Sequence, residues 1–493
     1  MQHIFKTGNF FILMTDKPNV IRIKKGLDIN LQGKAPKEII NIYQSESFAV
    51  VPDHYTGITP KAIVRVGDKV KAGTPLMVDK FHPEMKFVSP VSGEVTGINR
   101  GDKRKILSIT VQPDEQIDYE RFDVQNFQSY EPENLKALLL ETGLWPFIKQ
   151  RPYDRVANPS DTPRDIFVTA CYSAPLAPDF DFIINGEEDV LRTGLRVLAK
   201  LTAGTVYLGL KEDSAGFDKL RKTLVGDGKN NHGAKADSAG RFDLPDDNIE
   251  VIALSGPHPI GNAGVMINKI KPVNKGETVW TLNVADVLFI GRLFKTGTVD
   301  FRRTIALTGS GMAIRGYAQA IAGCTVGSLV EGKLSADPKR LRIISGNVLT
   351  GVKVSTGDYL GAYDNQITVI PEGDDVDEFI GWAMPGFGKY SVSHTFFTWM
   401  QDKKKEYALD ARIRGGKRAI VMSNEYDKVF PMDIYPEYLL KAIIAFDIDK
   451  MEQLGIYEVA PEDFALCEFV DTSKIEIQQI VRNGLDLLYK EMN

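Results

Sequence analysis

"IEVIALSGPHPIGNAG", Ile249 to Gly264, joins an apolar run to a loop that holds three glycines and two prolines. A short apolar run is typical of a strand that is buried on both faces, as in a parallel sheet. The loop after such a strand lies at the carboxyl edge of the sheet, where open α/β sheets bind ligands. The stretch therefore predicts a parallel α/β sheet with a candidate binding loop.

The preceding sequence alternates strands and helices. "RDIFVTACY" (164–172) and "GTVYLGL" (204–210) have the composition of buried strands, and "GEEDVLRTGLRVLAKLT" (186–202) is an amphipathic helix. Strands separated by helices of this length indicate βαβ crossovers. We predict a Rossmann-like domain over residues 121–265.

The N-terminal part has a different sequence pattern. "VRVGDKVKAGTPL" (64–76) and "INRGDKRKILSITV" (98–111) each carry a Gly-Asp-Lys turn followed by strand residues. This recurrence suggests two interlocked half-sandwiches of short antiparallel strands, so we predict a lipoyl-like barrel-sandwich over residues 14–120. Residues 1–13 are predicted to be an extension upstream of the true translation start, because "MTDKPNV" at Met14 resembles the beginning of a protein.

The C-terminal half contains two further regions. Residues 266–394 mix short strands with one helix, which predicts a small α+β, grasp-like domain. "PEYLLKAIIAFDIDKMEQLG" (436–455) and "IEIQQIVRNGLDLLYKEM" (475–492) are strong helices, so residues 395–493 are predicted to be a helical domain. The fold class is therefore multi-domain α/β and α+β.

Composition excludes several functions. Lys+Arg 60 against Asp+Glu 65 gives a net charge of −5, which argues against a general nucleic-acid binder. Cys171, Cys324 and Cys467 lie far apart, so a disulfide framework, a zinc ribbon and a four-cysteine cluster are not expected. No run approaches the about 18 to 20 apolar residues that span a bilayer, and we predict no transmembrane segment. The histidines show no metal-ligand spacing, and we predict no metal site.

"EMKFVSPVSGEV", Glu84 to Val95, looks like the hairpin that presents biotin on a carrier lysine. A carrier lysine sits at a hairpin tip, so a strand of about five residues should separate it from the next turn. Only Phe87, Val88 and Ser89 lie between Lys86 and Pro90. We therefore predict that Lys86 carries no covalent cofactor.

Nucleotide-binding signals are also missing. The strand at 164–172 runs into "TACYSAPLAPDFDF", where prolines and Tyr172 stand in place of a GxGxxG loop. "TGSGMAIRG" (308–316) lacks the fingerprint spacing. No Ser/His/Asp or paired-carboxylate arrangement can be picked out, and no catalytic residue is predicted.

Two sets of residues are candidates for binding. His258 lies between the prolines of the loop and could donate a hydrogen bond to a quinone carbonyl or an anionic group; alternatively the loop is a rigid linker whose histidine bonds backbone. A basic run follows residue 400 and comprises Lys403, Lys404, Lys405, Arg412 and Arg414. Such a run is usually a solvated face, but it could instead meet anionic lipid or an acidic partner.

Several stretches resemble one family. They are "IRIKKGLDINLQGKAP" (21–36), "VSPVSGEVTGINRGDKRKI" (88–106), "GPHPIGNAG" (256–264), "VWTLNVADVLFIGRLFKTG" (279–297) and "YLGAYDNQITVIPEG" (359–373). Together they resemble the A subunit of the Na⁺-translocating NADH:quinone reductase, from Val20 to the C-terminus. The fold of that family is similar to the flavin-carrying subunit of complex I and to the C subunit of the Rnf complex, and it includes an SLBB-type grasp domain.

The resemblance implies a peripheral subunit on the cytoplasmic side of a bacterial inner membrane. The six-subunit enzyme oxidises NADH, reduces ubiquinone or menaquinone and pumps Na⁺, with FAD, FMN, riboflavin and iron centres on other subunits. It implies that this chain binds no cofactor, contributes to quinone binding and assembles with the other subunits, most closely with a membrane-embedded flavin subunit.

The candidates for quinone contact are His258, Gly261 and Asn262. Two alternatives stay open at this point. The chain could be a purely structural scaffold, or it could be an active FMN-dependent NADH dehydrogenase subunit.

Overall fold

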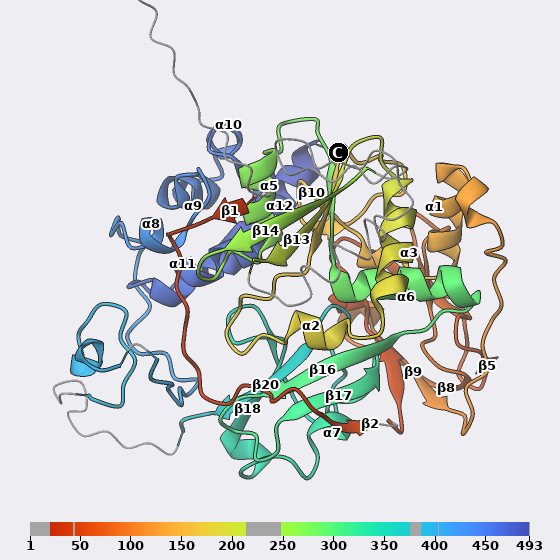
Figure 1. Ribbon diagram of the computed structural model, residues 1–493, viewed down its shortest axis with the longest axis horizontal. Coiled ribbons are helices and arrows are strands. Elements are labelled where there is room, and N and C mark those ends of the chain that lie inside the picture. The colour runs from red at the N-terminus through yellow and green to blue at the C-terminus, as the bar shows by residue number, and fades with distance from the viewer. Residues whose placement is uncertain (1–19, 43–44, 213–247, 375–385, 403, 493) are drawn as a thin grey trace, which may run out of the picture.

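The computed structural model describes residues 20–42, 45–212, 248–374, 386–402 and 404–492. The extension predicted for residues 1–13 lies outside them. A parallel sheet occupies the centre of the molecule, and a second sheet lies below it in Figure 1, with the strands of the barrel-sandwich to one side. The C-terminal helices, in blue, cover the upper left of Figure 1. The predicted multi-domain α/β fold, with a barrel-sandwich and an SLBB-type domain, is confirmed.

The central sheet has seven strands in the order β1-β14-β13-β12-β15-β10-β11. They are β1 (Val20–Arg22), β10 (Lys149–Arg151), β11 (Arg155–Val156), β12 (Ile166–Thr169), β13 (Val206–Lys211), β14 (Ile249–Ser255) and β15 (Val279–Asn283). The first five in this order are parallel, and β10 is antiparallel to β15. From β12 the chain moves outward through β13 to β14 and then returns to place β15 on the other side of β12. The gap between the ends of β12 and β15 is therefore the topological switch point of the sheet.

Helices cover both faces of this sheet. They are α3 (Glu188–Ala199), α5 (Ala263–Ile270) and α6 (Val284–Thr296). On β12, Ile166 and Val168 lie in one core with α3 and α6, whereas Phe167 lies in the other core with α5 and the C-terminal helices. The alternation follows the two-residue period of a strand, and it explains why the strand sequence is apolar throughout.

Four elements differ from the predicted domain limits. Strand β1, expected in the barrel-sandwich, pairs with β14, and β2 (Ile39–Ile42) joins the lower sheet beside β17 (Gly316–Ile321). Strand β15 and helix α6, expected in the grasp-like domain, belong to the central α/β layers. The Rossmann-like part thus continues past residue 265. Short strands at a sheet edge are placed by whichever backbone groups are available for pairing, which their own sequence does not reveal.

The barrel-sandwich consists of a four-stranded sheet, β3-β9-β8-β5, and a three-stranded sheet, β4-β6-β7. Its strands are β3 (Phe48–Val50), β4 (Pro60–Ala62), β5 (Lys69–Val70), β6 (Pro75–Asp79), β7 (Lys86–Val88), β8 (Gly93–Arg100) and β9 (Ile106–Pro113). Lys86 is the first residue of β7, and its Nζ lies 3.3 Å from a carboxylate oxygen of Glu141 at the end of α1 (Pro132–Glu141). It is therefore a strand residue in an ion pair and does not sit at a hairpin tip.

The lower sheet has the order β19-β18-β20-β16-β17-β2. The elements not yet given are α2 (Phe180–Ile183), β16 (Arg302–Thr308), α7 (Val326–Val330), β18 (Leu341–Ser345), β19 (Val352–Val354) and β20 (Gln366–Pro371). The C-terminal helices are α8 (Tyr426–Val429), α9 (Pro436–Ile444), α10 (Ile448–Gln453), α11 (Ala465–Val470) and α12 (Ile477–Met492). Among the described residues, no helix has the length and apolar character needed to cross a membrane.

A buried ion pair joins the central and lower sheets. Arg303 of β16 donates to the Asp286 carboxylate on α6 at 2.5 Å, and both side chains are only 1% exposed. Arg303 also donates to the Asn365 side-chain oxygen at 3.0 Å. Burial raises the pKa of Asp286 to about 6 although the guanidinium opposes the shift. Loss of either side chain would therefore leave the other one buried without its ion-pair partner.

We expect Arg303→Leu to lower the free energy of unfolding by about 3 to 5 kcal/mol, because it leaves a buried carboxylate without its cation. Urea denaturation followed by circular dichroism measures the loss. The double variant Asp286→Ala/Arg303→Leu should recover much of it. Arg302→Leu is the control on the same strand, since its 67%-exposed side chain pairs with Asp300 at the surface and should cost less than about 1 kcal/mol. Equal losses for the two single variants would contradict the expectation.

Candidate functional site

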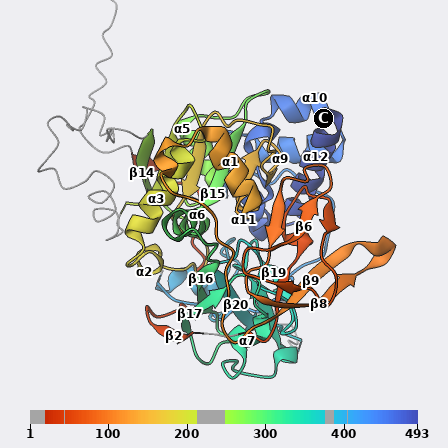
Figure 2. The ribbon, with the colours of Figure 1, turned by 90° about the vertical axis from the view of Figure 1, so that its right-hand side faces the viewer.

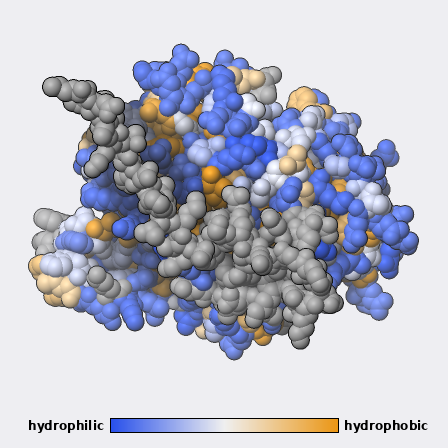
Figure 3. Space-filling model, turned by 45° about the horizontal axis from the view of Figure 1, so that its top comes forward, coloured by the Kyte–Doolittle hydropathy of each residue, from blue (hydrophilic) through white to orange (hydrophobic). Residues whose placement is uncertain are grey.

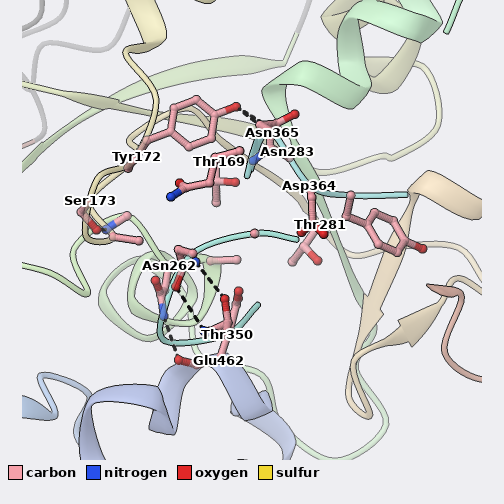
Figure 4. Close-up of a pocket in the computed structure, with 18 of the residues that line it drawn as sticks. Thr169, Tyr172, Ser173, Asn262, Thr281, Asn283, Thr350, Asp364, Asn365 and Glu462 are labelled. Carbon is pink, nitrogen blue, oxygen red and sulfur yellow. Dashed lines mark hydrogen bonds between the residues drawn. The ribbon is translucent and has the colours of Figure 1, made fainter. Parts of the chain in front are cut away.

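A cavity of about 420 Å³ lies at the switch point of the central sheet. Its walls come from the carboxyl ends of β12 and β15, the β14–α5 loop, the turns of the lower sheet and the C-terminal domain. Residues on these walls include Thr169, Tyr172, Ser173, Gly261, Asn262, Thr281, Asn283, Asp364, Asn365 and Glu462 (Figure 4). The position is the one at which open α/β sheets bind ligands.

Two glycines, Gly261 in the β14–α5 loop and Gly264 in the first turn of α5, permit contacts that no other residue would allow. A Cβ on Gly261 would overlap the carbonyl oxygen of Cys171, in the loop after β12. A Cβ on Gly264 would overlap the carboxylate of Asp463, in the C-terminal domain. The loop can therefore lie against both segments at once, and this close approach brings the walls of the cavity together.

His258 holds this loop in place through hydrogen bonds to neighbouring segments. Its Nδ1 lies 2.9 Å from Ser173 Oγ, and the same Oγ accepts a hydrogen bond from the Gly261 backbone at 3.0 Å. The backbone N–H of His258 donates to Asp28, and its carbonyl accepts from Leu27. Burial lowers the pKa of His258 to about 4, so the ring is neutral at pH 7. Gly261 and Asn262 line the cavity, whereas His258 lies outside its lining.

Tyr172 and two asparagines form a polar network at the strand ends. The Tyr172 hydroxyl donates to Asn283 Oδ1 at 2.6 Å, and Asn365 Nδ2 lies 3.2 Å from both oxygens (Figure 4). Asn283 also caps helix α6 by accepting from the Ala285 backbone. Sequence reasoning noted the bulk of Tyr172 but missed Asn283 and Asn365. The helix cap in "LNVAD" was the available signal for Asn283.

The lining holds more carboxyl groups than cations. The carboxyl groups belong to Asp154, Asp286, Asp364 and Glu462, and the cation among the described lining residues is Lys149, whose ammonium lies 4.3 Å from the centre of the Tyr363 ring. Guanidinium groups behind the lining offset two of these carboxyl groups, that of Arg303 at Asp286 and that of Arg151 at Glu462. A phosphate group in this cavity would meet carboxylates, and Tyr172 occupies the turn where glycine N–H groups would cradle it. The residues of the cavity therefore do not fit FMN or another phosphate-bearing nucleotide.

Glu462 is the lining carboxyl group that titrates near neutrality. Its Oε1 lies 3.2 Å from the fully buried guanidinium of Arg151, which donates to Asp463 at 2.7 Å. The Glu462 side chain is 45% exposed, but protein surrounds the cavity into which it opens. Enclosure and the neighbouring Asp463 raise the pKa of Glu462 to about 7, against the influence of Arg151. Asn262 donates to its backbone carbonyl at 3.2 Å.

The basic run lies apart from the cavity. Lys403 is outside the described residues, and Lys404 is exposed. Lys405 donates to the Phe387 carbonyl at 2.6 Å, while Arg412 and Arg414 both donate to Asp410 at 2.6 and 3.4 Å. Lys404, Lys405, Arg412 and Arg414 do not belong to the cavity lining, so these four residues form a separate surface.

Cysteines and metal ligands add no further site. Cys171, Cys324 and Cys467 are free and buried, and burial raises the pKa of Cys171 to about 11 and that of Cys324 to about 12. Within the described ranges, no cluster of three or more histidine, cysteine or acidic side chains could hold a metal ion.

The fold and the cavity define the class of protein. It is a Rossmann-like α/β protein with an attached barrel-sandwich and a grasp-type domain. Its candidate site lies at the position where open α/β sheets bind nucleotides, but Tyr172 stands where a glycine-rich phosphate loop would be needed.

Comparison with known families identifies the particular member of this class. Residues 21–114 match the NqrA N-terminal barrel-sandwich hybrid domain, residues 130–227 and 215–299 the NqrA second alpha/beta domain, and residues 304–356 the NQRA C-terminal domain. The A subunit of the Na(+)-translocating NADH-quinone reductase of Vibrio anguillarum is 35% identical over 96% of this chain and its own full length. Its counterpart from Neisseria meningitidis is 35% identical over the same shares. The chain belongs to the family of Na⁺-translocating NADH-quinone reductase A subunits, as the sequence resemblance predicted.

A solved structure gives only a weak likeness. The NAD⁺-reducing [NiFe]-hydrogenase in the H2-reduced state matches with a TM-score of 0.35 and 12% identity, over 67% of this chain and 55% of that chain. Such a score supports no structural argument.

We expect Glu462→Gln to change the pH dependence of stability. The pKa of about 7 in the folded chain exceeds the ordinary value of 4.5, so folding favours the neutral carboxyl group. The stability from this group is complete below pH 4.5 and is lost as the pH rises to about 7. Glutamine never ionises, so the melting temperature of the variant relative to the natural chain should rise by about 2 °C between pH 5 and pH 8, allowing for solvent screening.

Differential scanning fluorimetry at the two pH values measures this difference. Glu141→Gln, which removes an exposed carboxylate from α1, is the matched control and should shift the melting temperature equally at both. A pH-independent effect of Glu462→Gln would contradict the assignment.

Proposed function

We propose that this chain binds the head group of a quinone in the cavity at the switch point, as the A subunit of a Na⁺-pumping NADH:quinone oxidoreductase. Its relatives are named as subunits of Na(+)-translocating NADH-quinone reductase. A quinone head group is planar, uncharged and carries two carbonyl acceptors. The cavity offers amide and ammonium donors between aromatic rings, and its carboxylates disfavour phosphate.

The candidate contacts are Asn262 and Lys149. Each carries a nitrogen donor for a quinone carbonyl, and both line the same cavity. Asn365 lines it too, but both N–H groups of its amide already donate, to Tyr172 and Asn283. Gly261 acts through its lack of a side chain, because it lets the loop lie against Cys171. His258, also considered as a contact, is better suited to positioning the loop through Ser173.

Reduction of a quinone to a quinol takes two electrons and two protons. In this proposal the electrons come from a reduced flavin on another subunit, and this chain holds no prosthetic group. Glu462 lies on the cavity wall with a pKa of about 7, so it can give up one proton near neutral pH, be recharged from solvent and then give up the second.

We further propose that the chain is a peripheral subunit on the cytoplasmic side of the membrane. A membrane-embedded flavin subunit is its principal partner, and ubiquinone or menaquinone is the substrate. The charge of the chain, −5, is consistent with the prediction that nucleic acid is no partner.

Tryptophan fluorescence during titration with a short-chain ubiquinone tests the binding site. Trp145 and Trp280 stack edge to face at 5.1 Å, and Trp280 directly precedes Thr281 on the cavity wall. We expect saturable quenching, and about tenfold weaker binding by Asn262→Ala through the loss of one hydrogen bond. The Asn262 side chain makes no capping bond to α5, so this helix should survive the substitution.

Asn99→Ala, on an exposed strand of the barrel-sandwich, is the matched control and should bind like the natural chain. Equal affinity of the natural chain and Asn262→Ala would place the quinone elsewhere. A response that never saturates would leave the chain as a purely structural scaffold.

Absorbance and NADH-dependent dye reduction test the flavin alternative. An FMN-dependent dehydrogenase would be purified yellow and would reduce the dye with NADH. Because the acidic cavity does not fit a phosphate group, we expect the chain expressed alone to be colourless and inactive, both before and after incubation with FMN. Stoichiometric FMN retained through gel filtration would contradict this expectation.

A further inference from the structure

Exposed apolar side chains gather in one part of the molecule. Among the described residues, 19 large hydrophobic side chains are exposed, and eleven of these belong to residues 386–446. Four of them form what we name the apolar tip: Phe387, Phe397, Trp399 and Met400 are 53, 46, 53 and 59% exposed. A concentration of this kind marks an interaction surface, whereas single exposed apolar residues do not.

The apolar tip is held in place by local contacts. A short 3-10 turn, Phe397–Met400, carries three of its members. The rings of Phe387 and Phe397 lie 6.0 Å apart, and His394 stacks on Trp399 at 5.7 Å. Lys405 fixes the Phe387 carbonyl with a hydrogen bond of 2.6 Å. These contacts fix the conformation of the turn, and its apolar side chains remain exposed.

The segment around the tip is strongly basic. Residues 386–418 contain eight lysines and arginines against three aspartates and glutamates, a net charge of +5 in a chain whose total is −5. Arg412 and Arg414 share the single carboxylate of Asp410, and Lys404 is exposed. The remainder of the chain accordingly carries a net charge of −10, so this segment differs from it in the sign of its net charge.

We propose that the apolar tip inserts into the head-group region of an anionic lipid bilayer, with the surrounding lysines against lipid phosphates. Figure 1 shows the segment, in light blue, projecting at the lower left end of the molecule, and Figure 3 shows hydrophobic surface exposed at this end. The convex shape of the tip suits a flat membrane surface. A surface that binds a peptide would instead be expected to form a groove. Tryptophan is favoured at the membrane–water interface, and each nearby lysine adds attraction to anionic lipid.

This inference is separate from the quinone cavity. Residues of the apolar tip do not line that cavity, so bilayer binding and quinone binding can fail independently. In this proposal the basic run and the apolar tip act together on the membrane. The sequence alone did not connect these two features.

Co-flotation of the full chain with vesicles tests the proposal. We use phosphatidylcholine vesicles and vesicles in which about a third of the lipid is phosphatidylglycerol, at low and at high salt. The chain is expected to float with the anionic vesicles at low salt, and to do so much less with neutral vesicles or at high salt. Trp399→Ala/Met400→Ala should lower partitioning at least about fivefold, and Lys404→Ala about fivefold.

Phe81→Ala is the matched control, because Phe81 is 72% exposed but belongs to the barrel-sandwich. It should float like the natural chain. No binding to anionic vesicles, or binding unchanged by the tip substitutions, would overturn the proposal, and in the first case a protein partner would be the remaining occupant of the surface.

Quenching of fluorescence by brominated lipid provides a second measurement. Trp145 and Trp280 are buried and out of reach of lipid. The measurement uses Trp382→Phe as its background, so that Trp399 is the remaining reporter among the four tryptophans of the chain. Inserted Trp399 should be quenched, and Trp399→Phe should still bind but lose most of this quenching. Vesicle binding without any quenching that depends on Trp399 would show that another surface makes the contact and would overturn the insertion.

Discussion

The close packing of the β14–α5 loop is the constraint on which the rest of the site depends. Gly261 leaves room for the carbonyl of Cys171, and Gly264 leaves room for the carboxylate of Asp463. His258 adds backbone hydrogen bonds to the segment Leu27–Asp28. Three distant parts of the chain thus meet here, and a cavity remains beyond the carboxyl ends of β12 and β15. A larger side chain at either glycine would have to separate those parts, because interiors of this kind have no spare volume.

The cavity has the location of a nucleotide site and a different chemistry. Tyr172, Asn283 and Asn365 close the strand ends with hydrogen bonds among themselves. The carboxylates of the lining then set the electrostatic character, which favours neutral or hydrogen-bonding ligands over phosphate. Glu462 differs from the other carboxylates because enclosure and Asp463 together outweigh Arg151. Fold and function are separable here, since a Rossmann-like sheet supplies the position and only the side chains supply the chemistry.

Net charge and exposed apolar side chains distinguish one segment of the molecule from the rest. The segment 386–418 is basic and carries exposed aromatic residues, whereas the rest of the chain is acidic. Such a distribution orients a protein toward an anionic surface before any close contact forms. The cavity, by contrast, depends on buried pairs such as Asp286 with Arg303, which salt screens far less than surface charges.

The sequence by itself determined strands β12, β13 and β14 and helix α3 of the central layers, the barrel-sandwich and the lack of a glycine fingerprint, because periodicity and turn residues are local properties. It also singled out the loop 255–264 and thereby Gly261 and Asn262 on the cavity wall. Only the tertiary structure decided that β1, β2 and β15 join sheets other than those expected, since pairing depends on backbone groups far away in the chain. The same holds for Asn365, Lys149 and Glu462. Each is unremarkable in its own segment, and the proximity that gives it a role comes from residues on other domains.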